Sequence, residues 1–135
     1  MYNPQDVDIL IKRVHGRCKA GPQYGTMLPV LLDVCMIRDL PILDVGLGYY
    51  TSVILHYLYG DRVTSSETYV EASFPRIISF DGADRRIQAS WLIPGSIWVL
   101  HDCDDDYCQQ AVAVLRRHSC TFHGPEPRTL VACIK

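Results

Sequence analysis

The feature that most constrains the fold is a pair of glycines between an apolar segment and a helical segment. The apolar run PILDVG (residues 41–46) predicts a short buried strand that ends at Gly46, and Gly48 follows two residues later. Residues 50–59 then predict a helix, which Gly60 ends. Glycine allows a sharp turn and a close approach of a ligand to the backbone, and open α/β sheets bind ligands at such strand ends. A plain strand-to-helix turn would have the same pattern, so both interpretations are open at this point.

The rest of the chain alternates between helix and strand patterns. Further helices are expected over residues 5–18, 26–38, 84–92 and 104–118. Further strands are expected over residues 62–67, 76–81, 96–101, 120–122 and 129–134, the last two as an antiparallel hairpin. We therefore predict one α/β domain over residues 1–135, a three-layer Rossmann-like sandwich with a mostly parallel sheet and helices on both faces. Residues 1–39 would supply the N-terminal helices and residues 40–135 the sheet core.

Composition narrows the class of protein. With 48% hydrophobic and 21% charged residues, the 135-residue chain is typical of a globular domain. Its net charge of −2 disfavours a nucleic-acid partner, because nucleic-acid binders usually carry a strong basic field. No apolar run approaches the roughly 20 residues that span a bilayer, and the polar start MYNPQDVD is unlike a secretion signal. We expect a cytoplasmic protein without membrane contact, and the sequence leaves a homodimer open.

The six cysteines are expected to be free thiols. Most of them lie in apolar stretches such as LLDVCMI and LVACIK, as small buried side chains do in a reducing compartment. The chain has no Cys-x-x-Cys pair, which disfavours a structural zinc site. The cysteines are Cys18, Cys35, Cys103, Cys108, Cys120 and Cys133.

The pattern Asp-x-Gly-x-Gly-x-x-Thr at residues 44–51 resembles the first motif of class I S-adenosylmethionine-dependent methyltransferases. In that family the loop holds the amino-acid part of the cofactor. The third glycine of the dinucleotide fingerprint and the Gly-Lys-Ser/Thr of a P-loop are both missing, which disfavours those alternatives. The resemblance implies a cofactor site made by Asp44, Gly46, Leu47, Gly48 and Thr51.

Glu67 ends the next expected strand, about 20 residues after the loop, where the same family places an acidic residue. A carboxylate at this point can accept both ribose hydroxyl protons of an adenosyl ligand. A solvated glutamate at a strand end is the alternative interpretation.

Two further strand ends also match this resemblance, which runs from about residue 25 to residue 110. Phe80-Asp81-Gly82 and a Pro94-Gly95 turn leading to His101-Asp102 resemble a methyltransferase branch with similar strand ends. Adjacent parallel strands bring such ends within about 5 Å of each other. We therefore expect Asp81 and His101 to be catalytic, as general bases, and Asp81 also to contact the cofactor.

Two alternatives remain open at these strand ends. Related catechol-type enzymes end the matching strand in Asp-Asn and hold a divalent metal there, whereas this chain has His101-Asp102. We expect no resident metal, and a divalent cation stays the alternative. Asp102 and Asp104 would otherwise cap the helix that follows.

The expected function is methyl transfer from S-adenosylmethionine to a small hydroxylated substrate. The alternative is a non-catalytic, methyltransferase-like module that binds a ligand or a protein. Only residues 68–75 separate two expected parallel strands, where the family usually has a helix, a strand and another helix, and where a crossover normally needs a dozen residues. This short interval favours the module, whereas the glycine loop and Glu67 favour the enzyme, so the sequence alone leaves the question open.

Overall fold

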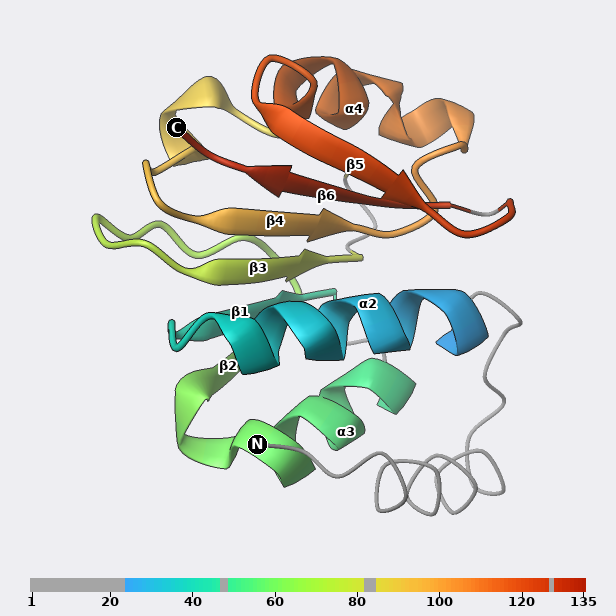
Figure 1. Cartoon of the computed structure of the whole chain (residues 1–135). Helices are drawn as coiled ribbons and strands as arrows, with labels where there is room; N and C mark the ends of the chain where they lie inside the picture. Colours follow the sequence, from blue (N-terminus) through green and yellow to red (C-terminus); the bar gives the residue numbers. More distant parts are fainter. Residues whose placement is uncertain (1–23, 47–48, 82–84, 127) are drawn as a thin grey trace.

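A computed structural model describes residues 24–46, 49–81, 85–126 and 128–135, and within these ranges helices flank a six-stranded sheet (Figure 1). The strands are β1 (Ile42–Val45), β2 (Val63–Ser66), β3 (Ile77–Phe80), β4 (Ile97–Leu100), β5 (Ser119–His123) and β6 (Thr129–Cys133). The α-helices are α2 (Tyr24–Ile37), α3 (Tyr49–Tyr59) and α4 (Gln109–Leu115). The helix expected over residues 5–18 lies outside the described residues. None of the described helices is long and apolar enough to cross a membrane.

The strands lie in the order β2-β1-β3-β4-β6-β5. Strands β1 to β4 pair in parallel, and β6 runs antiparallel to both of its neighbours, β4 and β5. The mostly parallel sheet and the antiparallel C-terminal hairpin predicted from the sequence are therefore confirmed. From β1 the chain passes to β2 on one side and then returns to β3 on the other side. The order thus reverses between β1 and β3, which is where open α/β sheets form a binding crevice.

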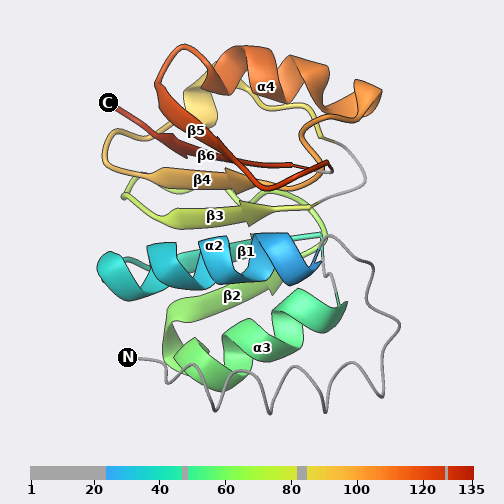
Figure 2. The same cartoon turned by 45° about the vertical axis from the view of Figure 1, so that its right-hand side comes forward.

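Helices cover both faces of the sheet (Figure 2), as expected. On one face α2 and α3 pack on a core that includes Leu28, Ile54 and Ile77. On the other face α4 packs on a core that includes Trp98 and Leu115. Strand β1 alternates between these cores, since Ile42 belongs to the first and Leu43 to the second. This explains why β1 is apolar along nearly its whole length.

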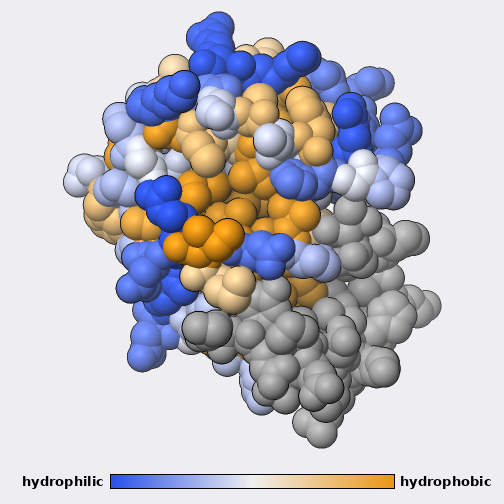
Figure 3. Space-filling model, in the orientation of Figure 1, coloured by the Kyte–Doolittle hydropathy of each residue, from blue (hydrophilic) through white to orange (hydrophobic). Residues whose placement is uncertain are grey.

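Helix α2 confirms the helix expected over residues 26–38, with a start two residues earlier. It buries five apolar side chains, although Met36 and Ile37 at its end are exposed. Apolar residues gather in the middle of the face shown in Figure 1, over α2 and the strands beside it (Figure 3). The five buried residues are Met27, Leu28, Leu31, Leu32 and Cys35.

The prediction of a helix over residues 84–92 is wrong. Residues 85–88 have no regular structure, and only a single 3₁₀ turn forms at Ala89–Trp91. The backbone of Ile87 finds its partners outside the segment, because its N–H donates to Gln110 Oε1 (2.8 Å) and its carbonyl accepts from Gln110 Nε2 (2.9 Å). A side chain of α4 thus replaces the hydrogen bonds that a helix would have made.

The helix expected over residues 104–118 is shorter than predicted. A 3₁₀ turn occupies Asp106–Cys108, and α4 itself covers Gln109–Leu115. The carboxylate of Asp104 does not cap the helix, because it accepts hydrogen bonds from the backbone N–H (2.7 Å) and the Nε (2.8 Å) of Arg128. Asp104 therefore ties the end of β4 to the start of β6.

The connection from β2 to β3, residues 67–76, contains no helix or strand. Its residue Tyr69 stacks between Trp91 and Trp98, with ring centroids 4.2 Å and 5.6 Å away. The Tyr69 hydroxyl accepts a hydrogen bond from Arg76 Nη2 (2.6 Å). The short interval noted in the sequence is thus an extended segment held against the sheet by aromatic stacking.

Five of the six cysteines lie in the described residues, and all five are free thiols. Burial raises the pKa of Cys35 to about 12 and that of Cys108 to about 11, so these thiols stay protonated at neutral pH. Cys133 is exposed on β6. Cys18 lies outside the described residues.

Candidate functional site

Four of the predicted site residues form one row along the carboxyl edge of the sheet. The last residues of the four parallel strands are in register, and the residue after each strand end is Gly46, Glu67, Asp81 or His101. Backbone hydrogen bonds extend the parallel pattern into this row, from Gly46 N to Ser66 O (2.8 Å), Asp81 N to Val45 O (3.0 Å) and His101 N to Phe80 O (3.2 Å). The topology therefore brings a glycine turn and three chemistry-bearing side chains, from four separate segments, to one edge.

Gly46 lies between β1 and α3, as expected, and its backbone shows why the residue is glycine. Its φ is +108°, a conformation that residues with a side chain rarely adopt. Leu47 and Gly48, the other predicted contacts of the loop, lie outside the described residues. Thr51 lies in the first turn of α3, where its buried Oγ1 has no hydrogen-bond partner among the described residues. Thr51 is 2% exposed and is not among the described residues that line the cavity at the ends of β1, β2 and β3.

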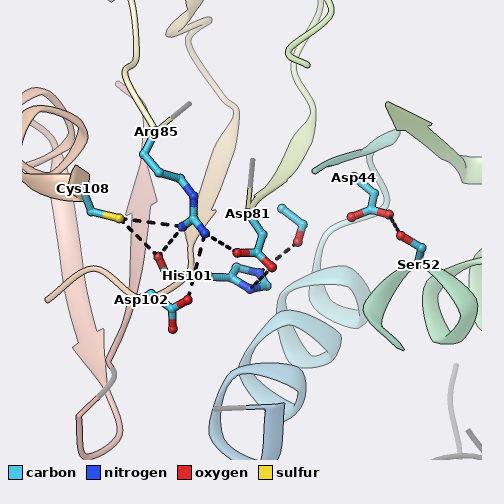
Figure 4. A network of polar contacts seen from close by, with 8 residues as sticks. Asp44, Ser52, Asp81, Arg85, His101, Asp102 and Cys108 are labelled. Atoms are coloured by element: carbon cyan, nitrogen blue, oxygen red, sulfur yellow. Dashed lines mark hydrogen bonds and ion pairs between the residues drawn. The ribbon is translucent and has the colours of Figure 1, made fainter. Parts of the chain in front are cut away.

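Asp44 holds the turn together from inside the sheet. Its side chain is buried, and Oδ2 accepts hydrogen bonds from the hydroxyls of Ser52 on α3 and Ser65 on β2, the latter at 2.9 Å. Figure 4 shows Asp44 turned toward Ser52, apart from the other acidic residues. Asp44 thus joins β1, β2 and α3, and does not appear among the described residues that line the cavity next to the turn.

A cavity of about 380 Å³ lies at the carboxyl ends of β1, β2 and β3. This volume lies within the roughly 300–1,000 Å³ range of small-molecule sites. Its walls combine apolar and aromatic surface with an exposed carboxylate, that of Glu67. The described lining residues are Val45, Glu67, Thr68, Tyr69, Phe80, Arg86 and Trp91.

Asp81 and His101 lie together beyond β3 and β4 (Figure 4). His101 Nδ1 is 3.7 Å from Asp81 Oδ2, and His101 Nε2 is 3.1 Å from the buried Ser79 hydroxyl. An Nδ1–H facing a carboxylate leaves Nε2 to accept the Ser79 proton, so these neighbours favour the Nδ1–H tautomer. The His101 side chain is 1% exposed, whereas Asp81 is about one-fifth exposed. Asp81 is therefore the member of the pair that a ligand can reach.

Burial shifts the pKa values of both groups toward their neutral forms. Desolvation raises the pKa of Asp81 to about 6, with Arg85 opposing the shift and Asp102 and Asp44 adding to it. Desolvation, helped by Arg85, lowers the pKa of His101 to about 3. His101 is thus neutral across the physiological range, and Asp81 titrates close to neutral pH.

Arg85 is the residue of this cluster that the sequence did not single out. Its Nη2 donates to Asp81 Oδ1 and lies 4.0 Å from Asp102 Oδ2, and its Nη1 donates to the carbonyl of His101 (2.9 Å). The sequence indicated its role only through its position four residues after Asp81. Ser79, the partner of His101, gave no signal because it stands inside an apolar strand.

Asp102 departs from the expected helix cap. Its φ is +50°, which turns the chain sharply after β4, and the 3₁₀ turn that follows has no side-chain cap. Desolvation raises the pKa of Asp102, with Arg85 opposing the shift. Among the described residues, no group of three or more His, Cys, Asp or Glu side chains is placed to hold a metal ion.

Comparison with known proteins does not assign this chain to a family. No protein-family model matches this chain, and no curated protein matches it. The structure itself establishes an α/β fold with a mostly parallel sheet, and it has a cavity at the carboxyl edge of that sheet. Because such folds host many chemistries, the function has to be argued from this site.

Proposed function

We propose that this chain binds S-adenosylmethionine in the cavity at the ends of β1, β2 and β3 and transfers its methyl group to a small hydroxylated substrate. The observation that carries the proposal is the cavity itself, which is lined by Val45, the residue before the Gly46 turn, and by the exposed carboxylate of Glu67. The resemblance of residues 44–51 to the methyltransferase loop supports the same assignment.

The lining of the cavity suits an adenosyl group. Glu67 would accept the two ribose hydroxyl protons, and charge-assisted hydrogen bonds of this kind contribute roughly 1.5–3 kcal/mol each. Phe80, Trp91 and Val45 supply apolar surface for the flat base. The turn at Gly46 and the Thr51 hydroxyl would bind the amino-acid part, while Asp44 keeps the turn in shape through Ser52 and Ser65.

Asp81 would act as the general base. When bound, S-adenosylmethionine would supply an electrophilic methyl group to the substrate oxygen, with S-adenosylhomocysteine as the leaving group. Asp81 would take the hydroxyl proton, since a carboxylate with a pKa of about 6 is suited to proton transfer near neutral pH. His101 is too deeply buried to touch a substrate, so it would contribute only by lying beside Asp81, with Nδ1 3.7 Å from Oδ2.

The first test is calorimetric titration of S-adenosylmethionine into wild type, Glu67→Gln and Glu67→Ala. Glu67→Gln should weaken binding about ten- to a hundredfold, because one or two charge-assisted bonds are lost, and Glu67→Ala should weaken it further. Glu71→Gln is the matched control, since Glu71 is an exposed glutamate of the same segment but does not line this cavity. Equal affinity for wild type and Glu67→Gln would reject the ribose role.

The second candidate is a non-catalytic module that keeps the fold. The segment of residues 67–76 favours it, because that segment has no helix or strand where the resembled family usually has three elements. The same titration separates the two functions. A folded wild type that does not bind S-adenosylmethionine would reject the cofactor assignment and favour the module.

A further inference from the structure

The guanidinium of Arg85 lies between two carboxylates at the base of the acidic cluster (Figure 4). Its neighbours in the described part of the chain include three oxygen atoms: Asp81 Oδ1, Asp102 Oδ2 at 4.0 Å and the carbonyl of His101 at 2.9 Å. The Arg85 side chain is 6% exposed. A full positive charge is therefore buried at the carboxyl edge, between the ends of β3 and β4.

These oxygens are the ligands that a hard divalent cation prefers, namely carboxylates and a backbone carbonyl. In this chain the positive charge of the guanidinium already lies beside both carboxylates. The guanidinium also donates directional hydrogen bonds to Asp81 Oδ1 and to the carbonyl of His101. A metal ion at the same place would meet this positive charge at close range, and the arginine cannot lose its proton to relieve the repulsion.

The placement of Arg85 is built into the surrounding fold. The segment that carries it is not helical, because Gln110 holds the backbone of Ile87 against α4. Cys108, at the start of the same helix, contacts Arg85 Nη1 through its sulfur at 3.7 Å. Arg85 is thus directed inward by contacts on both sides of the cluster.

We propose that Arg85 is the resident cation of this site, in the place that a divalent metal would take between Asp81 and Asp102. The native chain then binds no metal there, and a variant that lacks the guanidinium gains a metal site. This inference stands whether or not the chain binds S-adenosylmethionine.

The test is a titration with Mn²⁺, followed by the loss of the electron paramagnetic resonance signal of the free ion. Wild type should bind no Mn²⁺ at this site up to about 1 mM, the weak end of protein cation sites. Arg85→Ala should bind at least tenfold more tightly than wild type, and Mn²⁺ should raise its melting temperature. Arg85→Lys keeps a positive charge and should resemble wild type, as should Arg86→Ala, which removes the exposed neighbouring arginine. Adding Asp102→Asn to Arg85→Ala should abolish the gain.

Two results would overturn the proposal. One is Mn²⁺ binding by wild type that Asp81→Asn removes, because the guanidinium would then share the site with a metal. The other is a folded Arg85→Ala variant that binds Mn²⁺ no better than wild type. If Arg85→Ala folds only in part, Mn²⁺ should restore its circular dichroism spectrum, and failure to do so while Arg85→Lys folds normally would count equally against the proposal.

Discussion

The buried pair Asp81 and His101 combines two ionisable groups whose pKa shifts act on stability in opposite directions. The raised pKa of Asp81 means that the folded state holds a proton that the unfolded state has released. The lowered pKa of His101 means that the folded state lacks a proton that the unfolded state would bind. In the wild-type protein the two effects oppose each other, so single substitutions are needed to reveal them.

Asp81→Asn should become more stable relative to wild type as the pH rises. The contribution of Asp81 is fully present below its unfolded pKa near 4 and is lost as the pH rises through its folded pKa of about 6. The difference between the two proteins should therefore change between about pH 4 and pH 7, by on the order of 3 kcal/mol. Urea unfolding at a series of pH values measures it.

His101→Gln should show the reverse dependence. Wild type loses stability as the pH falls from about 6.5 toward 3, because the buried imidazole resists the proton that the unfolded chain takes up. The variant has no such group, so it should gain stability relative to wild type in acid. Parallel curves for all three proteins would show that neither group is shifted as the burial implies.

The candidate site could be predicted from the sequence only where residues follow strand ends. Asp81 and His101 each stand directly after an apolar run and Glu67 ends the expected strand RVTSSE, and the parallel sheet brings the three into one row. Arg85 and Ser79 could not be found in this way. Their roles depend on the directions of their side chains, which no local sequence pattern encodes. Arg85 points inward to the carbonyl of His101, and Ser79 on β3 contacts the buried ring of His101.

At the scale of elements, the strands were predicted well and two helices were not. Strands β1, β3 and β4 are buried along their full length, so their continuous apolar runs are a direct consequence of the parallel sheet. The segment around Ile87 has a helix-compatible sequence, but its hydrogen-bond partner is Gln110, about twenty residues further along the chain. A contact between residues so far apart in the sequence overrides the local helix propensity and leaves no periodic pattern in the sequence.

Gln110→Ala should destabilise the protein by about 2–4 kcal/mol, because the N–H and carbonyl of the buried Ile87 both lose their partner. Gln109→Ala is the matched control in the same turn of α4. Its amide donates to the part-buried Cys103 O and to the exposed Asp105 O, where water can replace it, so the expected loss is smaller, about 1 kcal/mol. Urea unfolding of both variants tests the difference, and equal losses would contradict the role given to Gln110.

At the scale of the whole molecule, the strand order sets which parts open most readily. Strands β1 and β3 have neighbours on both sides and belong to both cores, whereas β2 and β5 each pair with one neighbour in the described sheet. Amide hydrogen exchange should therefore be slowest in β1 and β3, and faster by one or more orders of magnitude in β2 and β5. Nuclear magnetic resonance exchange rates measure this, and uniform protection across the six strands would contradict it.

The position of β6 in the sheet has a consequence for the chain while it is being synthesised. Strand β6 follows the other five described strands in the sequence, yet it lies between β4 and β5. Until residues 129–133 emerge, β4 and β5 each present unpaired backbone groups toward that gap. Such open edges invite pairing with other chains. During synthesis the chain therefore carries two open strand edges, which become paired only when β6 forms between β4 and β5.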